Sequence, residues 1–250
     1  MMLLEHFIEH NARSFPDKTA LICRGEELSY AELWAAVQRK SSELRLTQSK
    51  SVVVRAAASI DFLTTSFASP LAGKVAVPLE ADIPQEKLNA IALTVNKSDV
   101  PPEVADILYT TGTTGSQKGA MISHQALIAN AENLIEAQQF SRELTFIVCG
   151  PLNHIGSLSK IWPTMMVGGT VRILEGMKDM ADFFNAAEAA PGKVATFLVP
   201  ASIRMLISLG KRQLESIAHK MDFLETGAAP IAQSDMDALC SILPHSRLYN

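Results

Sequence analysis

Cysteine is scarce in this sequence, and its few positions are scattered. Cys23, Cys149 and Cys240 lie far apart, their number is odd, and no Cys-x-x-Cys pair occurs. Such spacing supplies neither a disulfide framework nor a cysteine-based zinc site. We therefore expect reduced, buried thiols and a cytoplasmic location.

Long apolar runs and an excess of basic residues are missing too. No uninterrupted apolar stretch reaches membrane-spanning length, and the start of the chain lacks the basic segment of a signal peptide. The net charge is −4, which argues against a nucleic-acid binder that depends on a global basic field. Since 48% of the 250 residues are hydrophobic and 19% are charged, the chain is suited to a buried core.

Two familiar phosphate-binding motifs are also absent. The dinucleotide fingerprint Gly-x-Gly-x-x-Gly does not occur. The Walker pattern needs Gly-Lys-Ser/Thr after a first glycine, but in the segment 106–119 (DILYTTGTTGSQKG) position 117 is Gln. This segment instead has a short apolar run typical of a buried strand, followed by ten residues that include three glycines, four threonines, one serine and one lysine.

The segment 106–119 has the residue types of an anion-binding loop. Its glycines allow close approach of a bulky anion, its hydroxyls can donate to phosphate oxygens, and Lys118 adds a mobile positive charge. Ser123 is placed to cap a helix, so we expect a strand–loop–helix arrangement that forms a nest of backbone N–H groups. A glycine-rich surface turn is the alternative. The predicted phosphate-binding residues are Thr110, Thr111, Gly112, Thr113, Thr114, Gly115 and Lys118.

The run Tyr-Thr-Thr-Gly-Thr-Thr-Gly-Ser-x-Lys-Gly at 109–119 resembles the phosphate loop of the adenylate-forming enzymes. This superfamily includes acyl- and aryl-CoA synthetases, luciferases and the adenylation domains of peptide synthetases. Gln117 departs from the family pattern, which usually has proline before the lysine. Proline would stiffen the loop but offers phosphate no donor, so we expect the change to affect rigidity rather than chemistry.

Three further segments are similar to the same family. The opening of the chain, with Pro-Asp-Lys-Thr-Ala-Leu at 16–21, matches its amino-terminal region. Pro-Leu-Asn-His-Ile-Gly-Ser at 151–157 resembles a segment beside the acyl substrate, which implies that role for His154; a histidine satisfied within its own loop is the alternative. The last segment resembles a Gly-Gly-Ala-Pro turn whose backbone lies against adenine and the acyl group, and comprises Gly227, Ala228, Ala229 and Pro230.

Departures from the family pattern lead to three expectations. Asn153 replaces a frequent aromatic residue, so the substrate pocket should be more polar there. Ala228 replaces a glycine and should narrow the space at the turn. The interval between Pro78 and the Gly/Thr loop is short, so we expect one β–α unit to be missing or reduced.

The order of apolar patterns indicates an α/β architecture with parallel sheets. Strands are expected at 19–23, 27–29, 51–55, 74–79, 107–109, 144–149, 170–174, 196–199 and 223–226. Helices are expected at 3–15, after Ser29, and at 61–71, 83–96, 123–140, 157–166, 183–190 and 201–209. The resemblance refines this to two packed βαβ-type parallel-sheet lobes of an acyl-CoA synthetase-like amino-terminal domain, divided near 140–150.

The resemblance identifies residues 1–250 as a partial amino-terminal AMP-binding (adenylation) domain. In the family, a magnesium-binding glutamate, a ribose-binding aspartate and a small carboxy-terminal domain with a catalytic lysine come after this point. We expect that carboxy-terminal domain to be absent from the 250 residues, which would leave the chain catalytically incomplete by itself.

The activity implied by the resemblance is that of an AMP-forming acyl-CoA synthetase. It would use ATP to convert a carboxylic acid into an acyl-adenylate and then transfer the acyl group to coenzyme A, with Mg²⁺ as the metal. Lys118 and His154 are the implied catalytic residues, and fatty-acid metabolism is the implied setting. The alternatives are a non-catalytic nucleotide- or acyl-binding module and an adenylation enzyme that loads a carrier protein. A homodimer is left open.

Two residue groups have a structural and a functional interpretation. His6 and His10 lie one helical turn apart and could bind a metal, but no third ligand is evident, so we expect a solvated helix face. The methionines at 165, 166, 177 and 180 are expected to fill the core, with an acyl-chain wall as the alternative.

Overall fold

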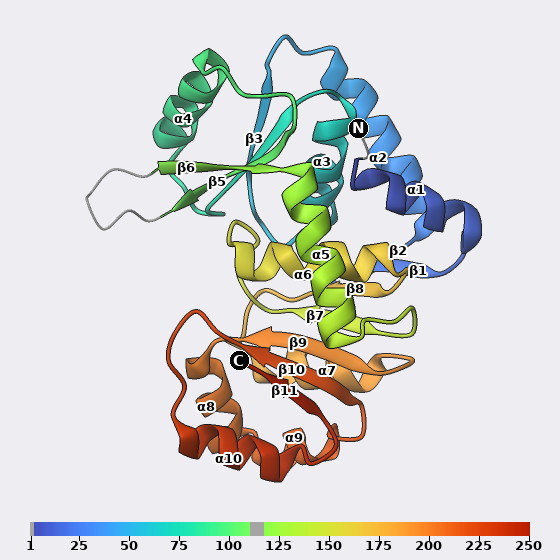
Figure 1. The fold of residues 1–250 in the computed structure, drawn as a ribbon, viewed down its shortest axis with the longest axis vertical. Coiled ribbons are helices and arrows are strands. Elements are labelled where there is room, and N and C mark those ends of the chain that lie inside the picture. Colours follow the sequence, from blue (N-terminus) through green and yellow to red (C-terminus); the bar gives the residue numbers. More distant parts are fainter. Residues whose placement is uncertain (1–2, 111–117) are drawn as a thin grey trace.

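Two β-sheets organise the computed structural model, which describes residues 3–110 and 118–250 (Figure 1). The four-stranded sheet has the order β3 (Ser51–Arg55), β4 (Val75–Leu79), β5 (Val104–Thr110) and β6 (Lys118–Ser123). The seven-stranded sheet has the order β11 (Arg247–Tyr249), β10 (Met221–Thr226), β9 (Val194–Leu198), β7 (Thr145–Val148), β8 (Thr170–Ile173), β1 (Thr19–Cys23) and β2 (Glu26–Ser29). Neighbouring strands are parallel except in the hairpins β1–β2 and β5–β6.

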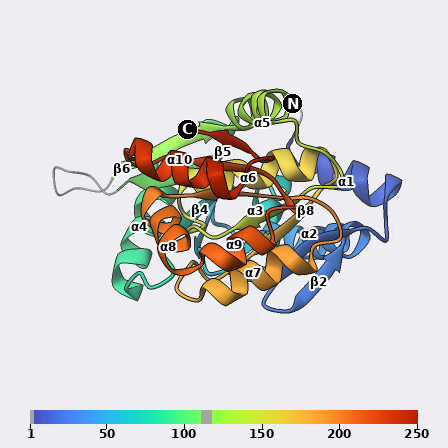
Figure 2. The same ribbon diagram turned by 90° about the horizontal axis from the view of Figure 1, so that it is seen from below.

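Helices cover the sheets in three groups (Figures 1 and 2). The core between the sheets contains α1 (Glu5–Ser14), α2 (Tyr30–Arg45), α3 (Ile60–Leu71), α5 (His124–Gln138) and α6 (Ile155–Met166). The outer face of the four-stranded sheet packs against α4 (Gln85–Lys97). The outer face of the seven-stranded sheet packs against α7 (Met180–Ala189), α8 (Pro200–Leu209), α9 (Lys211–Ser216) and α10 (Gln233–Ile242). The α/β class expected from the sequence is therefore confirmed.

The central strands of the larger sheet are buried on both faces. Along β7, Phe146 and Val148 point into the core between the sheets, whereas Ile147 points into the core beneath α7 to α10. In β10, Phe223 and Leu224 divide in the same way. This alternation follows from the two-residue period of a strand, and it explains why these strands read as continuous apolar runs.

The helix expected after Ser29 is confirmed by α2. The Ser29 hydroxyl accepts a hydrogen bond from the Glu32 N–H, and the Glu32 carboxylate accepts one from the Ser29 N–H. This capping box satisfies two N–H groups that would otherwise be unpaired. By contrast, α9, α10 and β11 were not predicted: α9 and β11 are short, and α10 begins without a side-chain cap.

The strand–loop–helix arrangement expected around the Gly/Thr loop is wrong. The apolar residues at 120–122 belong to β6, which pairs antiparallel with β5, so that Lys118 lies opposite Thr110. Ser123 does cap α5, accepting from the Ala126 N–H, but the helix begins at the far end of the hairpin, where the His124 N–H donates to the Glu103 carbonyl. The N–H groups of α5 therefore do not reach the loop.

The two sheets do not divide the chain at a single point. A boundary near 140–150 separates α5 from β7, yet the hairpin at 19–29 joins the seven-stranded sheet because β1 pairs with β8. Helix α5 runs from the hairpin of the smaller sheet down to the larger sheet (Figure 1). The amino-terminal hairpin and α5 therefore tie the lobes together.

Two carboxyl groups face a small cavity of about 20 Å³, room for about one water molecule, at the junction of the lobes. Glu5 of α1 is buried, and its Oε2 has no hydrogen-bond partner in the described part of the chain. Asp106 of β5 and Ser66 of α3 line the same cavity. Burial, with a further contribution from Asp106, raises the pKa of Glu5 to about 8, and burial raises the pKa of Asp106 to about 7.

We predict that the free energy of unfolding falls as the pH rises from about 4 to about 8. In this window the folded chain binds protons that the unfolded chain has released, so stability decreases with pH. Glu5→Gln should flatten the dependence and stabilise the chain by about 2–3 kcal/mol at pH 8. Urea denaturation over a pH series measures this. Glu9→Gln, beside Arg13 on the same helix, is the control, and an unaltered slope in Glu5→Gln would contradict the prediction.

Candidate functional site

The seven-stranded sheet has a topological switch at β7. From β7 the chain crosses to β8 on one side, and the next strand, β9, pairs with β7 on its other side. Loops that leave the carboxyl ends of strands at such a point diverge, and ligands of open α/β sheets bind in the resulting crevice. The loop 150–154 follows β7 and Val199 follows β9, so His154 lies at this crevice.

A cavity of about 670 Å³ opens at this edge of the sheet. Most of its lining is apolar and comes from Ile155, Met177, Phe197, Leu198, Val199 and Ala228. His154, Ser157 and Ser202 supply the polar side chains. Among the described residues that line it there is no Asp, Glu, Lys or Arg. We call this space the apolar cavity; an uncharged or apolar group is the occupant that such walls favour.

A second cavity of about 490 Å³ adjoins it, between the carboxyl edges of the two sheets. The two cavities share Cys149, Gly150, Pro151 and His154, so His154 stands on the wall between them. Asn153 is buried and lines the second cavity rather than the apolar one. The expectation that Asn153 makes the substrate pocket more polar is therefore not met for the apolar cavity.

Three glycines near the apolar cavity lie close to neighbouring side chains. A Cβ atom added at Gly150 would collide with the Ser157 hydroxyl. Cβ atoms added at Gly156 and Gly227 would lie 3.2 and 3.4 Å from the ring of Phe197. The start of α6 and the end of β10 therefore lie close to the Phe197 ring of β9.

The turn 227–230 follows β10 and is largely exposed. Ala228 has φ = +66°, a left-handed conformation that favours glycine, so the alanine that departs from the family pattern is strained as well as larger. In the described ranges, the backbone N–H groups of Gly227, Ala228 and Ala229 form no hydrogen bond. Accessible, unpaired backbone groups fit a turn that contacts a nucleotide base through its main chain.

Two predicted phosphate-binding residues, Thr110 and the exposed Lys118, are paired where β5 ends and β6 begins. The predicted residues Thr111, Gly112, Thr113, Thr114 and Gly115 lie outside the described residues. The end of β5, the start of α6 and the end of β10 all point to the same side of the molecule, on the left of Figure 1. The ends of these three elements therefore lie on one side of the molecule.

Sequence reasoning missed part of the cavity wall. The sequence predicted only a strand at Phe197. The pairing of β9 with β7 and β10 places its ring in the wall of the apolar cavity. Met177 lines the cavity, as the acyl-wall alternative proposed, whereas Met165 is fully buried in the core. The available signal was its position: Phe197 is the next-to-last residue of β9, and side chains near strand ends often border ligand sites.

Neither a metal cluster nor a membrane span is found in the described residues. Groups of three or more His, Cys, Asp or Glu side chains that could hold a metal ion are absent from residues 3–110 and 118–250. Within the same ranges, every helix is too short or too polar to cross a membrane.

Comparison with known proteins connects the chain to enzymes. The family described as "AMP-binding enzyme" matches residues 8–100 and 89–250. Indoleacetate–CoA ligase of Aromatoleum aromaticum is 27% identical over 289 aligned positions, which cover 93% of this chain and 56% of the relative. Feruloyl-CoA synthase of an Amycolatopsis species is 28% identical over 220 positions, covering 71% and 45%. The chain therefore spans about half the length of these relatives.

Solved structures support the fold. ATP-bound MatB from Rhodopseudomonas palustris superposes with a TM-score of 0.79 at 23% identity, covering 98% of this chain and 59% of MatB. The amino-terminal subdomain of Klebsiella oxytoca NpsA, in complex with 3-hydroxyanthranilyl-AMSN, gives a TM-score of 0.83 at 17% identity, with 99% and 71% covered. At these identities the likeness shows a shared fold.

We predict that Gly150→Ala destabilises the chain by about 1–3 kcal/mol, because the added methyl group overpacks against Ser157. Gly150→Ala/Ser157→Ala should recover most of the loss, since the nearest remaining atom, the Cβ of residue 157, lies at 3.7 Å. Urea denaturation of both variants, with Ser157→Ala alone as control, measures this. Equal losses in the single and double variants would show that another contact sets the limit.

Proposed function

We propose, from the premise that this chain belongs to the AMP-binding enzyme family, that it activates an apolar carboxylic acid as an acyl-adenylate. The observation that supports this best is spatial. The loop with His154 and the turn 227–230 border the apolar cavity, and the hairpin that bears Lys118 points to the same side of the molecule. An acid seated in that cavity could present its carboxylate to a nucleotide held at the rim.

The proposed chemistry makes a poor acyl donor reactive. A carboxylate oxygen attacks the α-phosphate of ATP, an acyl-adenylate forms and pyrophosphate leaves. Lys118 and the Gly/Thr loop hold the β- and γ-phosphates and stabilise the charge on the leaving pyrophosphate. The backbone of 227–230 holds adenine, and His154 lies beside the acid carboxylate. Mg²⁺, when bound, neutralises phosphate charge.

The cavity walls narrow the class of acid. An amino acid or a dicarboxylic acid would bring a second charged group, and burying it without a partner costs several kcal/mol. The described lining of the apolar cavity offers no opposite charge. We therefore propose an aryl or aliphatic acid with a single carboxylate as the substrate.

The proposed acceptor of the acyl group is the thiol of coenzyme A. The names of several relatives include CoA, among them indoleacetate–CoA ligase and feruloyl-CoA synthase. Other relatives, such as gramicidin S synthase 2, are named without it, so a carrier-protein thiol is the second candidate. Comparing thioester formation on free coenzyme A and on a phosphopantetheinyl carrier separates the two.

ATP–pyrophosphate exchange by the complete protein tests the activity. A panel of indole-3-acetate, 4-coumarate, ferulate, octanoate, malonate and aspartate covers the relevant chemistry. We predict at least tenfold stimulation by one of the first four acids and none by malonate or aspartate. Preference for a doubly charged acid would contradict the substrate class, and no stimulation by any acid would contradict the activity.

His154→Ala tests whether the acid carboxylate binds beside His154. If His154 borders the carboxylate, this variant should raise the KM for the active acid several-fold while leaving the KM for ATP unchanged. A lowered melting temperature with unchanged acid dependence would assign His154 a structural role.

Lys118→Ala should lower the rate of acid-dependent exchange by one or more orders of magnitude. This is the scale of one electrostatic contact to charge that develops in the transition state. Lys97 is an exposed lysine at the end of α4, so Lys97→Ala is the matched control and should show the exchange rate of the unmodified protein. If Lys118→Ala matches the control, Lys118 is not part of the mechanism.

A further inference from the structure

Behind the apolar cavity, one carboxylate joins three elements. Glu225 of β10 accepts hydrogen bonds from Lys160 of α6, whose Nζ lies 2.7 Å from both carboxylate oxygens, and from Gln138 Nε2 of α5 at 2.8 Å. The side chains of Lys160 and Glu225 are only 5% and 18% exposed. We call Gln138, Lys160 and Glu225 the polar triad.

The polar triad lies against an aromatic wall of the cavity. Glu225 and Phe197 are partners across β10 and β9, so their side chains lie on the same face of the sheet. Lys160 Nζ is 5.7 Å from the centroid of the Phe197 ring, within the range of a cation–π contact. The ring packs against Gly156 and Gly227, so a shift of Glu225 or Lys160 displaces this wall.

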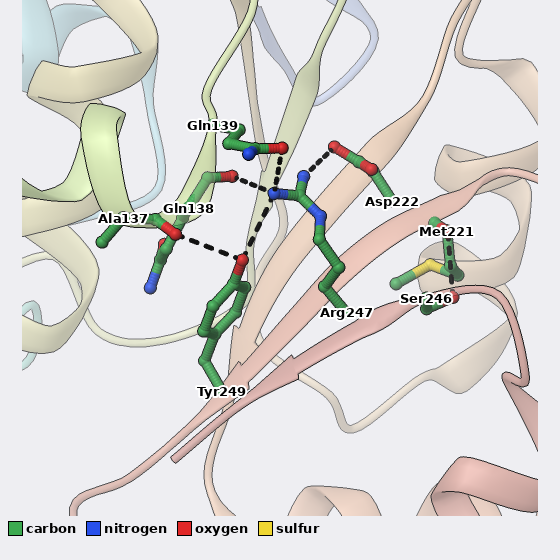
Figure 3. A network of polar contacts seen from close by, with 8 residues as sticks. All are labelled: Ala137, Gln138, Gln139, Met221, Asp222, Ser246, Arg247 and Tyr249. Atoms are coloured by element: carbon green, nitrogen blue, oxygen red, sulfur yellow. Dashed lines mark hydrogen bonds and ion pairs between the residues drawn. The ribbon is translucent and has the colours of Figure 1, made fainter.

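The end of α5 that supplies Gln138 is anchored independently (Figure 3). From β11, Arg247 Nη1 donates to the Gln138 carbonyl at 2.8 Å, and the Tyr249 hydroxyl donates to the Ala137 carbonyl at 3.3 Å. Arg247 also pairs with Asp222 at 2.7 Å. Gln138 is therefore held at two points, by Arg247 at its carbonyl and by Glu225 at its side chain.

Each element of the triad adjoins a segment of the candidate site along the chain. Helix α6 begins directly after His154, β10 runs into the turn 227–230, and α5 follows the hairpin that bears Lys118. We infer that the polar triad positions these segments relative to one another and so sets the shape of the acid-binding cavity. The nature of the ligand rests on the proposed function; the positioning of the segments does not.

Stability alone would not need these groups. Buried ion pairs can often be replaced by apolar side chains of similar size with no loss of stability, because desolvation offsets the Coulomb attraction. Gln138 Oε1 is buried and has no hydrogen-bond partner in the described part of the chain, which is a further cost. The hydrogen bonds of the triad are directional, so they specify one position of α5, α6 and β10 relative to one another.

The test replaces the whole triad at once. Gln138→Leu/Lys160→Met/Glu225→Leu removes the three polar groups together, so no charge is left buried without a partner. Asp61→Asn is the control, because Asp61 forms an ion pair with Lys40 at 3.0 Å that involves no member of the triad. Gln138→Leu alone is a second variant that keeps the ion pair intact.

We expect the urea concentration at the unfolding midpoint of the triple variant to equal or exceed that of the unmodified protein. Amide hydrogen exchange in the loops 150–156 and 227–230 should nevertheless be at least tenfold faster, with β7 and β9 unchanged. Gln138→Leu should accelerate exchange at 227–230 by a smaller factor, and Asp61→Asn should change neither loop. In the complete protein, the triple variant should raise the KM for the acid more than the KM for ATP.

If amide exchange in both loops of the triple variant is as slow as in the unmodified protein, the inference is overturned. If the triple variant does not fold, an unchanged exchange rate at 227–230 in Gln138→Leu overturns it instead. Absence of activity in the unmodified protein would count against the proposed function alone, because hydrogen exchange would still decide whether the triad positions the loops.

Discussion

Parallel pairing in the seven-stranded sheet is the constraint on which the rest of the structure depends. Because β7, β9 and β10 run in the same direction, their carboxyl ends meet at one edge. The loops that follow them, far apart in sequence, must then emerge side by side. Burial on both faces makes the register strict, since a slip of one residue would exchange the two apolar faces. The cavity is a consequence of that register and of the switch at β7.

Local signals in the sequence predicted most elements of this frame. The helix after Ser29 and the apolar runs of β3, β4 and β7 each depend on a few neighbouring residues, and the structure confirms them. The error at the Gly/Thr loop has a local cause as well. A three-residue apolar run after a loop does not reveal whether it starts a helix or pairs back on the preceding strand.

Contacts between distant residues could not be predicted in this way. Lys160 and Glu225 are 65 positions apart, and neither looks unusual in its own helix or strand. Glu5 would be placed on the solvent side of an amphipathic helix, yet the packing of α1 between the sheets buries it. Asn153 and His154 are adjacent, but the loop geometry places Asn153 on the second cavity alone. Such facts depend on tertiary packing rather than on pattern.

The fold buries charge-bearing groups in two different ways, and the difference separates stability from function. At the lobe junction, no Lys, Arg or His among the described residues lines the cavity that Glu5 and Asp106 share, so burial favours the protonated forms and raises the pKa values of both groups. Behind the cavity, Glu225 has Lys160 as an ion-pair partner at 2.7 Å. A rise in pH towards 8 therefore removes protons from the junction, away from the cavity wall. Loss of stability at alkaline pH should accordingly begin where α1 meets β5, while the packing around Phe197 is retained until the sheet itself unfolds.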